Sequence, residues 1–212
     1  MSKKRISKTR DWHKEHSNNQ YVKQANIEGY RSRAVYKLTE IDARDRLFRP
    51  GMTIVDLGAA PGGWSQWIAR RFEKQVKLFA LDILPIKPLP DVTFIQGDFR
   101  EQTVLDTLLN HLDKKKVDLV ISDMAPNISG IKAIDQPRII ELAELARDFA
   151  LDVLITNGHF LTKVFQGEDF DIFTKSLKSH FKQVVIRKPT ASRSQSSEVY
   201  VLAKQLKIAN NE

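Results

Sequence analysis

Short apolar segments alternate with helix-like segments from residue 53 onward, and no other feature of the sequence constrains the fold as much. Strands are expected over residues 53–58, 77–83, 92–99, 117–124, 158–165, 182–188 and 198–204. Helices are expected over residues 63–72, 101–112, 137–155 and 168–181. Such alternation is typical of right-handed βαβ units, so we expect an α/β fold built on a mostly parallel sheet with helices on both faces.

Two connections in this pattern lack a clear helix. The second and third strands are joined across the proline-rich "LPIKPLP", and the last two strands are joined only by "PTASRSQSSE". A parallel crossover usually contains a helix. The final strand is therefore expected to run antiparallel to its neighbour.

The two ends of the chain differ from the alternating part. Residues 1–29 hold seven lysines and arginines against three acids, with few aliphatic side chains, and such a segment cannot build a core. We expect a mobile basic arm over 1–29, one folded domain over 30–208 and a tail over 209–212. An early helix within 30–48 is expected to carry Lys37.

The composition of the whole chain limits the classes of partner and chemistry. Its 34 Lys and Arg against 26 Asp and Glu give a net charge of +8, which favours a polyanionic partner. The absence of cysteine excludes disulfides and thiolate chemistry. No apolar run approaches the roughly 18 residues of a membrane span. The basic N-terminus is not followed by the apolar segment of a secretory leader, so we expect a soluble, cytoplasmic monomer.

The stretch "VDLGAAPGGWSQW", residues 55–67, places a bare turn between the first strand and its helix. In open α/β sheets, ligands bind beyond the carboxyl ends of the strands, where glycines let the backbone approach closely. A tight connection without a ligand is the structural alternative. Acids after the next three strands, Asp82, Asp98 and Asp123, favour a nucleoside, because an acid at such a position accepts hydrogen bonds from ribose hydroxyls.

The spacing of the turn discriminates between nucleosides. NAD and S-adenosylmethionine both contain adenosine, but the turn does not match G-x-G-x-x-G, and Pro61 removes a backbone donor that a pyrophosphate would use. The chain also lacks G-x-x-x-x-G-K-[ST], which disfavours an NTPase. A rim of acids, Asp56, Asp82, Asp98 and Asp123, suits a cationic sulfonium. S-adenosylmethionine is therefore favoured.

A second group of charged residues is not explained by such a ligand. Lys37 lies on the early helix, Asp123 follows the fourth strand, Lys163 interrupts the fifth and Glu198 begins the last. Each has an ordinary interpretation, in which Lys163 extends to solvent and pairs with Asp123, while Lys37 and Glu198 are solvated. Taken together, they are expected to form a mixed-charge cluster beside the ligand.

Such a cluster suits methyl transfer to a ribose hydroxyl. The reaction needs the acceptor oxygen held in line with the S–CH3 bond and its proton removed. Lysine, with a reference pKa of about 10.4, is a poor base unless burial or a neighbouring cation lowers that value. We therefore expect Lys163 to be the base, Lys37 to be the neighbouring cation, and Asp123 and Glu198 to orient the reacting groups.

No metal is required, and none is expected. The H-x-x-H spacing of "HKEH" in the arm has no further ligand beside it. The five histidines of the chain form no convincing set of ligands; they are His13, His16, His111, His159 and His180.

Basic residues flank the charged cluster from two distant segments. Arg31 and Arg33 precede the early helix, and Arg187, Lys188 and Arg193 surround the loop before the last strand. Any one of them is an ordinary solvated side chain. Their convergence on the cluster makes them candidate contacts for the phosphates of a polyanionic partner.

Motifs along essentially the whole chain resemble the FtsJ/RlmE family of ribosomal-RNA ribose 2'-O-methyltransferases. They are "SRAVYKL", "DLGAAPGGWSQW", "FALDI", "GDF", "DLVISDMAPNISG", "FLTKVFQG" and "SSEVYVLA". The resemblance implies a Rossmann-like methyltransferase fold, with a seven-stranded sheet whose last strand is antiparallel, and S-adenosylmethionine as the methyl donor.

The resemblance also implies site residues and a substrate. The family's catalytic tetrad falls on Lys37, Asp123, Lys163 and Glu198, with Lys163 as proton acceptor. The family's cofactor contacts fall on Gly62, Trp64, Asp82, Asp98 and Asp123. The implied acceptor is a uridine in the A-loop of large-subunit (23S) ribosomal RNA. The implied partner is the assembled large ribosomal subunit, whose maturation the reaction would serve.

Alternatives stay open at this point. "DMAP" stands where base-methylating enzymes carry an acidic or polar residue, two prolines and an aromatic residue, but the second proline and the aromatic are missing. A non-catalytic ribosome-assembly factor would carry a damaged turn or tetrad, and neither is damaged. Trp64 is either a core anchor for its helix or a wall of the cofactor site.

Overall fold

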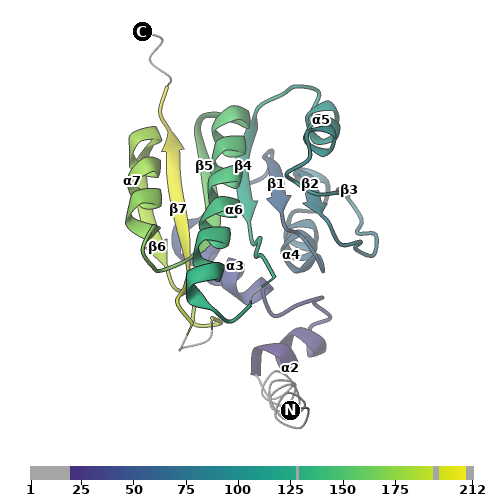
Figure 1. Cartoon of the computed structure of the whole chain (residues 1–212). Coiled ribbons are helices and arrows are strands. Elements are labelled where there is room, and N and C mark those ends of the chain that lie inside the picture. The colour runs from purple at the N-terminus through teal and green to yellow at the C-terminus, as the bar shows by residue number, and fades with distance from the viewer. Residues whose placement is uncertain (1–19, 128, 193–195, 209–212) are drawn as a thin grey trace.

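The computed structural model describes residues 20–127, 129–192 and 196–208. The strands are β1 (Thr53–Leu57), β2 (Lys77–Asp82), β3 (Val92–Gln96), β4 (Val117–Ser122), β5 (Leu154–Phe165), β6 (Phe181–Arg187) and β7 (Glu198–Leu206). The helices are α2 (Gln20–Ile27), α3 (Val35–Asp45), α4 (Gly63–Phe72), α5 (Gln102–His111), α6 (Lys132–Val153) and α7 (Phe170–His180), with a 3-10 turn η1 (Glu73–Gln75) (Figure 1). Within this part of the chain, no helix is long and apolar enough to cross a membrane.

The strands form one seven-stranded sheet in the order β3-β2-β1-β4-β5-β7-β6. Neighbouring strands from β3 to β5 are parallel, whereas β7 runs antiparallel to both β5 and β6. The predicted mostly parallel sheet with an antiparallel last strand is therefore confirmed. The order of the strands reverses between β1 and β4, which in open α/β sheets marks the ligand-binding crevice.

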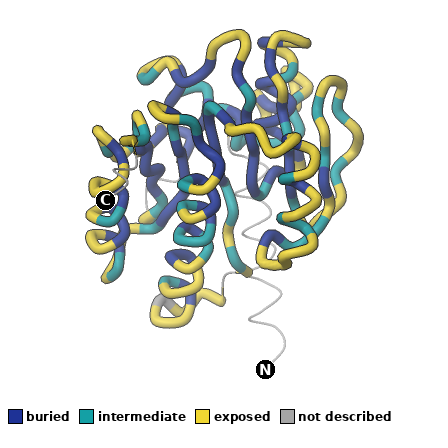
Figure 2. Tube along the Cα trace, turned by 90° about the horizontal axis from the view of Figure 1, so that it is seen from above, coloured by how far each residue is buried: buried dark blue, intermediate teal, exposed yellow. Residues whose placement is uncertain are grey.

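Helices cover both faces of the sheet, as predicted. Successive strand residues point to opposite faces, so Val120 belongs to the core cluster under α5, α6 and α7, while Ile121 belongs to the cluster under α3 and α4. Figure 2 shows the strands buried between helices whose outer surfaces are exposed. The two clusters fix the strand ends relative to the helices, and so position the groups at the carboxyl edge of the sheet.

Helix α6 begins five residues before the expected start at Pro137, at Lys132, and runs directly into β5. The Asp135 carboxylate accepts hydrogen bonds from the main-chain N–H groups of Ser129 and Gly130, each 2.8 Å long. These bonds hold the preceding loop against the first turn of the helix. A contact of this kind is invisible in the hydrophobic pattern, which is why the predicted start was late.

Helix α2 was not predicted, and it lies inside the predicted basic arm. Ala25 is only 2% exposed, and the ring of Tyr21 lies 5.5 Å from that of Tyr36 on α3. Aromatic contacts thus supply the packing that the scarcity of aliphatic residues argued against. Residues 1–19 and 209–212 lie outside the described part, so the boundaries of the arm, the domain and the tail stay predictions.

Candidate active site

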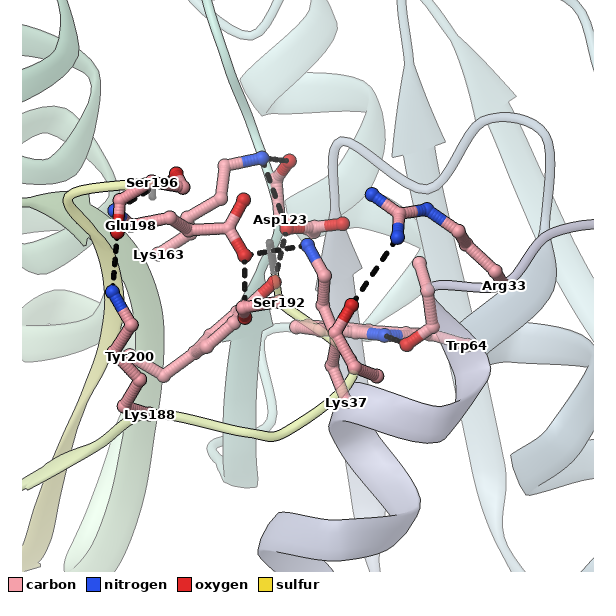
Figure 3. A network of polar contacts seen from close by, with 12 residues as sticks. Arg33, Lys37, Trp64, Asp123, Lys163, Lys188, Ser192, Ser196, Glu198 and Tyr200 are labelled. Atoms are coloured by element: carbon pink, nitrogen blue, oxygen red, sulfur yellow. Dashed lines mark hydrogen bonds and ion pairs between the residues drawn. The ribbon is translucent and has the colours of Figure 1, made fainter. Parts of the chain in front are cut away.

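The four residues of the predicted tetrad meet at the carboxyl edge of the parallel strands (Figure 3). Asp123 directly follows β4, and Lys163 lies near the end of β5. Because β7 is antiparallel, its first residue, Glu198, lies opposite Phe165 at this same edge. Lys37 reaches the cluster from α3. Four segments that are far apart in the sequence therefore build one site.

Each lysine of the cluster is paired with a carboxylate. Lys37 Nζ lies 2.6 Å from Glu198 Oε1, and Lys163 Nζ lies 2.9 Å from Asp123 Oδ1. Lys163 Nζ also donates to the main-chain oxygen of Asp123 at 2.6 Å. The two lysines are only 7% and 8% exposed. The expected pair of Lys163 with Asp123 thus exists, but it is buried, and Lys163 does not extend into solvent.

Two hydroxyl groups complete the cluster, and neither was predicted from the sequence. The Tyr200 hydroxyl donates to Asp123 Oδ1 at 2.7 Å, and Ser192 Oγ donates to Glu198 Oε1 at 3.0 Å. Tyr200 lies two residues after Glu198 on β7. Because side chains two residues apart on a strand share a face, Tyr200 could have been predicted to lie on the same face as Glu198. Ser192 lies in the loop before β7, where no periodic signal identifies it.

The charges of the cluster set its protonation. Burial alone would raise the pKa of Asp123, but Lys163 and Lys37 outweigh it and hold that pKa below the ordinary value. Burial, with the negative charges of Asp123 and Glu198, raises the pKa of Tyr200 well above its ordinary value. At neutral pH Asp123 is therefore ionised and Tyr200 protonated, which makes Tyr200 the donor.

The bare turn after β1 is required by the protein's own packing. Gly58 and Gly62 have φ values of +74° and +100°, in the left-handed region that favours glycine. A Cβ at Gly58 would lie 2.6 Å from the Met124 side chain, and one at Gly63 would lie 2.4 Å from Ser32 Oγ. The structural alternative is thus sufficient for these glycines, and evidence for a ligand has to come from the groups around them.

Asp82, at the end of β2, binds this turn directly. Its Oδ2 accepts a hydrogen bond from Ala60 N at 2.8 Å, and its Oδ1 accepts one from Leu84 N at 2.8 Å. The carboxylate therefore joins the turn to the loop after β2. Each oxygen of an ionised carboxylate can accept more than one hydrogen bond. Asp82 thus has capacity for ribose hydroxyls.

Two other predicted cofactor contacts are engaged within the protein. Hydrogen bonds from Arg100 lower the pKa of Asp98 to about 2, and the two side chains form an ion pair of 2.6 Å. The ring of Trp64 is 3% exposed, and its Nε1 donates to Ala34 O at 2.8 Å. The Trp64 ring thus packs as a core anchor for its helix, and its contact with the cofactor stays a prediction.

Asp56 was expected on the rim of the cofactor site, and this expectation is wrong. The residue is 0% exposed, because the alternation of β1 points it beneath α4. Ser65 Oγ donates to its Oδ2 at 2.6 Å, while Oδ1 has no hydrogen-bond partner among the described residues. Burial, together with the charges of Asp123 and Asp82, raises the pKa of Asp56 to about 7.

Two of the predicted phosphate contacts serve the fold instead. The Arg31 guanidinium donates to Lys87 O at 2.6 Å and to Pro88 O at 2.9 Å, which ties the segment before α3 to the loop after β2. Arg187 donates to both oxygens of Asp45, at 2.7 and 2.8 Å, and so ties β6 to α3. Both guanidinium groups are committed to partners inside the protein.

The other basic candidates border the charged cluster. Arg33 lies beside it in Figure 3 and donates to Ala191 O at 3.3 Å. Lys188 donates to Ser196 O in the loop before β7. Arg193 lies outside the described residues. Arg33 and Lys188 thus lie beside the charged cluster.

The described residues contain no group of three or more His, Asp or Glu side chains that could hold a metal ion. His159 Nδ1 accepts a hydrogen bond from Gln205 N at 3.1 Å, which gives it a structural role. The "HKEH" of the arm lies outside the described residues.

The sequence is similar to a known methyltransferase family and to individual proteins of that kind. The sequence model of "FtsJ-like methyltransferase" matches residues 30–206. "Ribosomal RNA large subunit methyltransferase E" of Nitrosospira multiformis is 56% identical over 199 residues, which cover 94% of this chain and 97% of that protein. The protein of the same name from Hydrogenovibrio crunogenus is 54% identical over 193 residues, which cover 91% of this chain and 94% of that protein.

A solved structure shares the fold. The crystal structure of a putative ribosomal RNA methyltransferase from Plasmodium falciparum matches with a TM-score of 0.76 and 30% identity, covering 84% of this chain and 98% of that one. The predicted Rossmann-like methyltransferase fold is therefore confirmed. On its sequence and its fold, this chain belongs to the FtsJ-like methyltransferase family.

Proposed function

We propose that the protein transfers a methyl group from S-adenosylmethionine to the 2'-hydroxyl of a uridine in 23S ribosomal RNA. The acceptor is the A-loop uridine of the assembled large subunit, and the reaction serves the maturation of that subunit. The convergence of Lys37, Asp123, Lys163 and Glu198 at the sheet edge that also carries Asp82 is the observation that carries the proposal. Relatives more than half identical to this chain, named for the large subunit, support the substrate.

The polar and charged groups at this edge of the sheet fit S-adenosylmethionine. Asp82 retains acceptor capacity for ribose hydroxyls, and the ionised Asp123 suits a neighbouring sulfonium. The main chain of Gly62 and Trp64 borders the same turn, and Asp98 contributes if Arg100 shares its carboxylate. Bound by these residues, S-adenosylmethionine supplies the methyl group.

Lys163 takes the proton of the acceptor hydroxyl. In its neutral form Nζ carries a lone pair, and the contacts to Asp123 Oδ1 and Asp123 O fix where that lone pair points. Lys37 is a second cation buried in the same cluster, which disfavours a further positive charge there. Once the proton is taken up, the ionised Asp123 stabilises the ammonium. Holding the reacting atoms at attack distance contributes on the order of 7–11 kcal/mol at most.

The acceptor RNA is bound through its phosphates. Arg33 and Lys188 border the cluster, and the chain carries a net charge of +8. Counterion release favours RNA on such a surface. We propose that the enzyme acts in the cytoplasm as a monomer on the large subunit, without a metal and without a membrane partner.

The substrate assignment is tested by supplying methyl-labelled S-adenosylmethionine with large subunits, naked ribosomal RNA or transfer RNA. We expect label on the 2'-oxygen of a single uridine of 23S RNA, with large subunits as the best substrate. Label on a base nitrogen would favour the base-methyltransferase alternative, and label only on transfer RNA would exclude the proposed acceptor. No label on any RNA would favour the assembly-factor alternative.

The role of Lys163 is tested by Lys163→Ala. Turnover should fall by at least about 100-fold, the usual contribution of a general base, while the Kd for S-adenosylmethionine changes little. Lys182→Ala is the matched control, because Lys182 donates to Asn157 Oδ1 at the surface, away from the cluster. Turnover of Lys163→Ala close to that of the wild type would exclude Lys163 as the base.

A further inference from the structure

The described residues hold each carboxylate of the cluster at only one of its two oxygens. Lys163 and Tyr200 both meet Asp123 at Oδ1, at 2.9 and 2.7 Å. Lys37 and Ser192 both meet Glu198 at Oε1, at 2.6 and 3.0 Å. Each carboxylate thus receives one ammonium and one hydroxyl on the same oxygen. Figure 3 shows these contacts converging from both sides of the cluster.

The two hydroxyl groups are rigidly held. Tyr200 is 0% exposed, its ring centroid lies 5.7 Å from that of Trp64, and Lys37 Nζ lies 5.6 Å from the Tyr200 centroid. Tyr200 is also the direct cross-strand neighbour of Lys163. Its hydroxyl therefore reaches Asp123 from the same face of the sheet as the lysine does.

Ser192 is fixed by its loop. It is 8% exposed, and its main-chain N–H donates to Pro189 O at 2.9 Å. Thr190, two residues earlier in this loop, donates to Glu40 Oε2 on α3 through both N and Oγ1, at 2.7 and 2.8 Å. The serine hydroxyl is thereby anchored to the helix that carries Lys37.

We propose that Tyr200 and Ser192 are positioning residues for methyl transfer, whose hydroxyls fix the rotation of two carboxylates so that Asp123 Oδ2 and Glu198 Oε2 face the acceptor ribose. A lysine on a flexible stem fixes the direction of a carboxylate poorly, whereas a second donor of fixed direction removes that freedom. The inference rests on the proposed function, because it assigns the unused oxygens to the acceptor of that reaction.

The Tyr200 hydroxyl also acts on Lys163 through Asp123. Both donors share Oδ1, so the hydroxyl satisfies part of the negative charge that Lys163 would otherwise meet alone. Without it, the Asp123 Oδ1 charge would be met by the Lys163 ammonium alone. The charged and titratable groups facing Lys163 are Asp123 after β4, Glu198 and Tyr200 on β7, Lys37 on α3 and Arg33 before it.

The test uses Tyr200→Phe and Ser192→Ala in the full-length protein, each of which removes one hydroxyl and little volume. Methyl transfer to large subunits is measured between about pH 6 and pH 9, with the Kd for S-adenosylmethionine measured in parallel. We expect both variants to lower kcat about tenfold at pH 7, the loss of one hydrogen bond to a charged group, with the donor Kd unchanged. For Tyr200→Phe alone, the rising limb of the rate profile moves to higher pH, so its defect shrinks as pH rises.

The matched controls remove similar hydroxyls elsewhere. Tyr36→Phe loses a tyrosine hydroxyl that donates to Glu28 at 3.0 Å, and Ser176→Ala loses a serine hydroxyl that donates to Phe173 O at 2.8 Å. Both should keep the kcat and pH profile of the wild type. Thermal unfolding of all four variants separates a folding defect from a defect in turnover.

Three outcomes would overturn the inference. Wild-type kcat in both variants would show that neither hydroxyl positions anything. A defect of Tyr200→Phe that is the same factor at every pH would show a structural role only. A wild type that methylates no ribose hydroxyl would overturn the proposed function and this inference with it, so the two failures are told apart by the wild type.

Discussion

At the scale of the single residue, Asp56 shows how position in a strand changes a carboxyl group. It lies one residue from Leu57 at the end of β1, yet its side chain is buried beneath α4, where Ser65 is its hydrogen-bond donor among the described residues. Burial of a carboxylate disfavours its charged form. The protein therefore favours the protonated acid, and its pKa of about 7 follows from burial first.

The prediction concerns Asp56→Asn and pH. A carboxyl whose pKa is raised on folding stabilises the fold fully below the unfolded value, near pH 4, and loses that contribution as pH rises to the folded value. Between pH 5 and pH 7 the free energy of unfolding of the wild type should therefore fall by about 1.4 kcal/mol per pH unit relative to Asp56→Asn. Urea denaturation of both proteins across this range measures the difference. Parallel curves would contradict the raised pKa.

Sequence reasoning found the charged cluster but not the surroundings of its members. Lys163 was singled out because a lysine interrupts an apolar strand, and Glu198 because it begins the antiparallel one, and the structure brings both to one place. Arg31, before α3, binds carbonyl oxygens, and Arg187, at the end of β6, binds a carboxylate, and no local sequence pattern indicates either partner. Only three-dimensional contacts distinguish these cases.

At the scale of the element, Arg31 joins three segments around the glycine-rich turn after β1. Its main-chain N–H donates to Gln66 on α4 at 2.9 Å, while its guanidinium binds Lys87 and Pro88 after β2. A Cβ at Gly62 would lie 2.9 Å from Arg31 Nη1, so the turn and this arginine are in direct contact. The start of α3 and the turn are thereby held in one arrangement.

Arg31→Ala should therefore weaken binding of S-adenosylmethionine. Loss of the two guanidinium bonds frees the loop after β2, and we expect the Kd to rise about tenfold, corresponding to roughly 1.4 kcal/mol. Isothermal titration calorimetry measures the change. Arg70→Ala is the matched control, since Arg70 also donates to carbonyls, those of Glu28 and Gly29, away from the turn. Equal Kd values for both variants would show that Arg31 does not support the binding of S-adenosylmethionine.

Asp45 joins α3 to the far edge of the sheet. Its side chain is 3% exposed and binds Arg187 and Lys204, from β6 and β7. Arg187→Ala leaves this carboxylate partly uncompensated in a buried place, so we expect a loss of about 3 kcal/mol in the free energy of unfolding. Arg49→Ala, which breaks an exposed pair with Asp118, should cost less than about 1 kcal/mol. RNA affinity of Arg187→Ala below the wild-type value, with unchanged stability, would restore the phosphate-contact interpretation.

At the scale of the whole molecule, periodicity predicted the sheet because its central strands are buried on both faces and its helices are amphipathic. Each expected strand was found, and β7 is antiparallel as predicted from the helix-free connection before it. The connection between β2 and β3 also lacks a helix, yet these two strands are parallel, so this signal alone does not determine direction. Helix α2 and the early start of α6 escaped this reasoning. Both depend on polar or aromatic contacts between distant residues, such as Tyr21 with Tyr36, which no local pattern encodes.

The net charge of +8 predicts how RNA binding responds to salt. Each phosphate contact to single-stranded RNA contributes about −0.7 to the slope of log K against log salt. An enzyme that grips several phosphates should therefore show a slope of about −2 to −4 between 50 and 200 mM salt. The Kd for S-adenosylmethionine, measured over the same range, should change less than about twofold. A flat RNA titration would exclude phosphate contacts as the main source of affinity.

The position of β7 has a consequence for biosynthesis. Strand β6 pairs with the sheet only through β7, and β7 brings both Glu198 and Tyr200 to the cluster. During translation, the nascent chain presents Lys37, Asp123 and Lys163 before these partners exist. The β5 edge of the sheet stays unpaired, and Lys37 lacks the Glu198 carboxylate, until β7 has left the ribosome. The complete cluster can therefore assemble only after β7 has been synthesised.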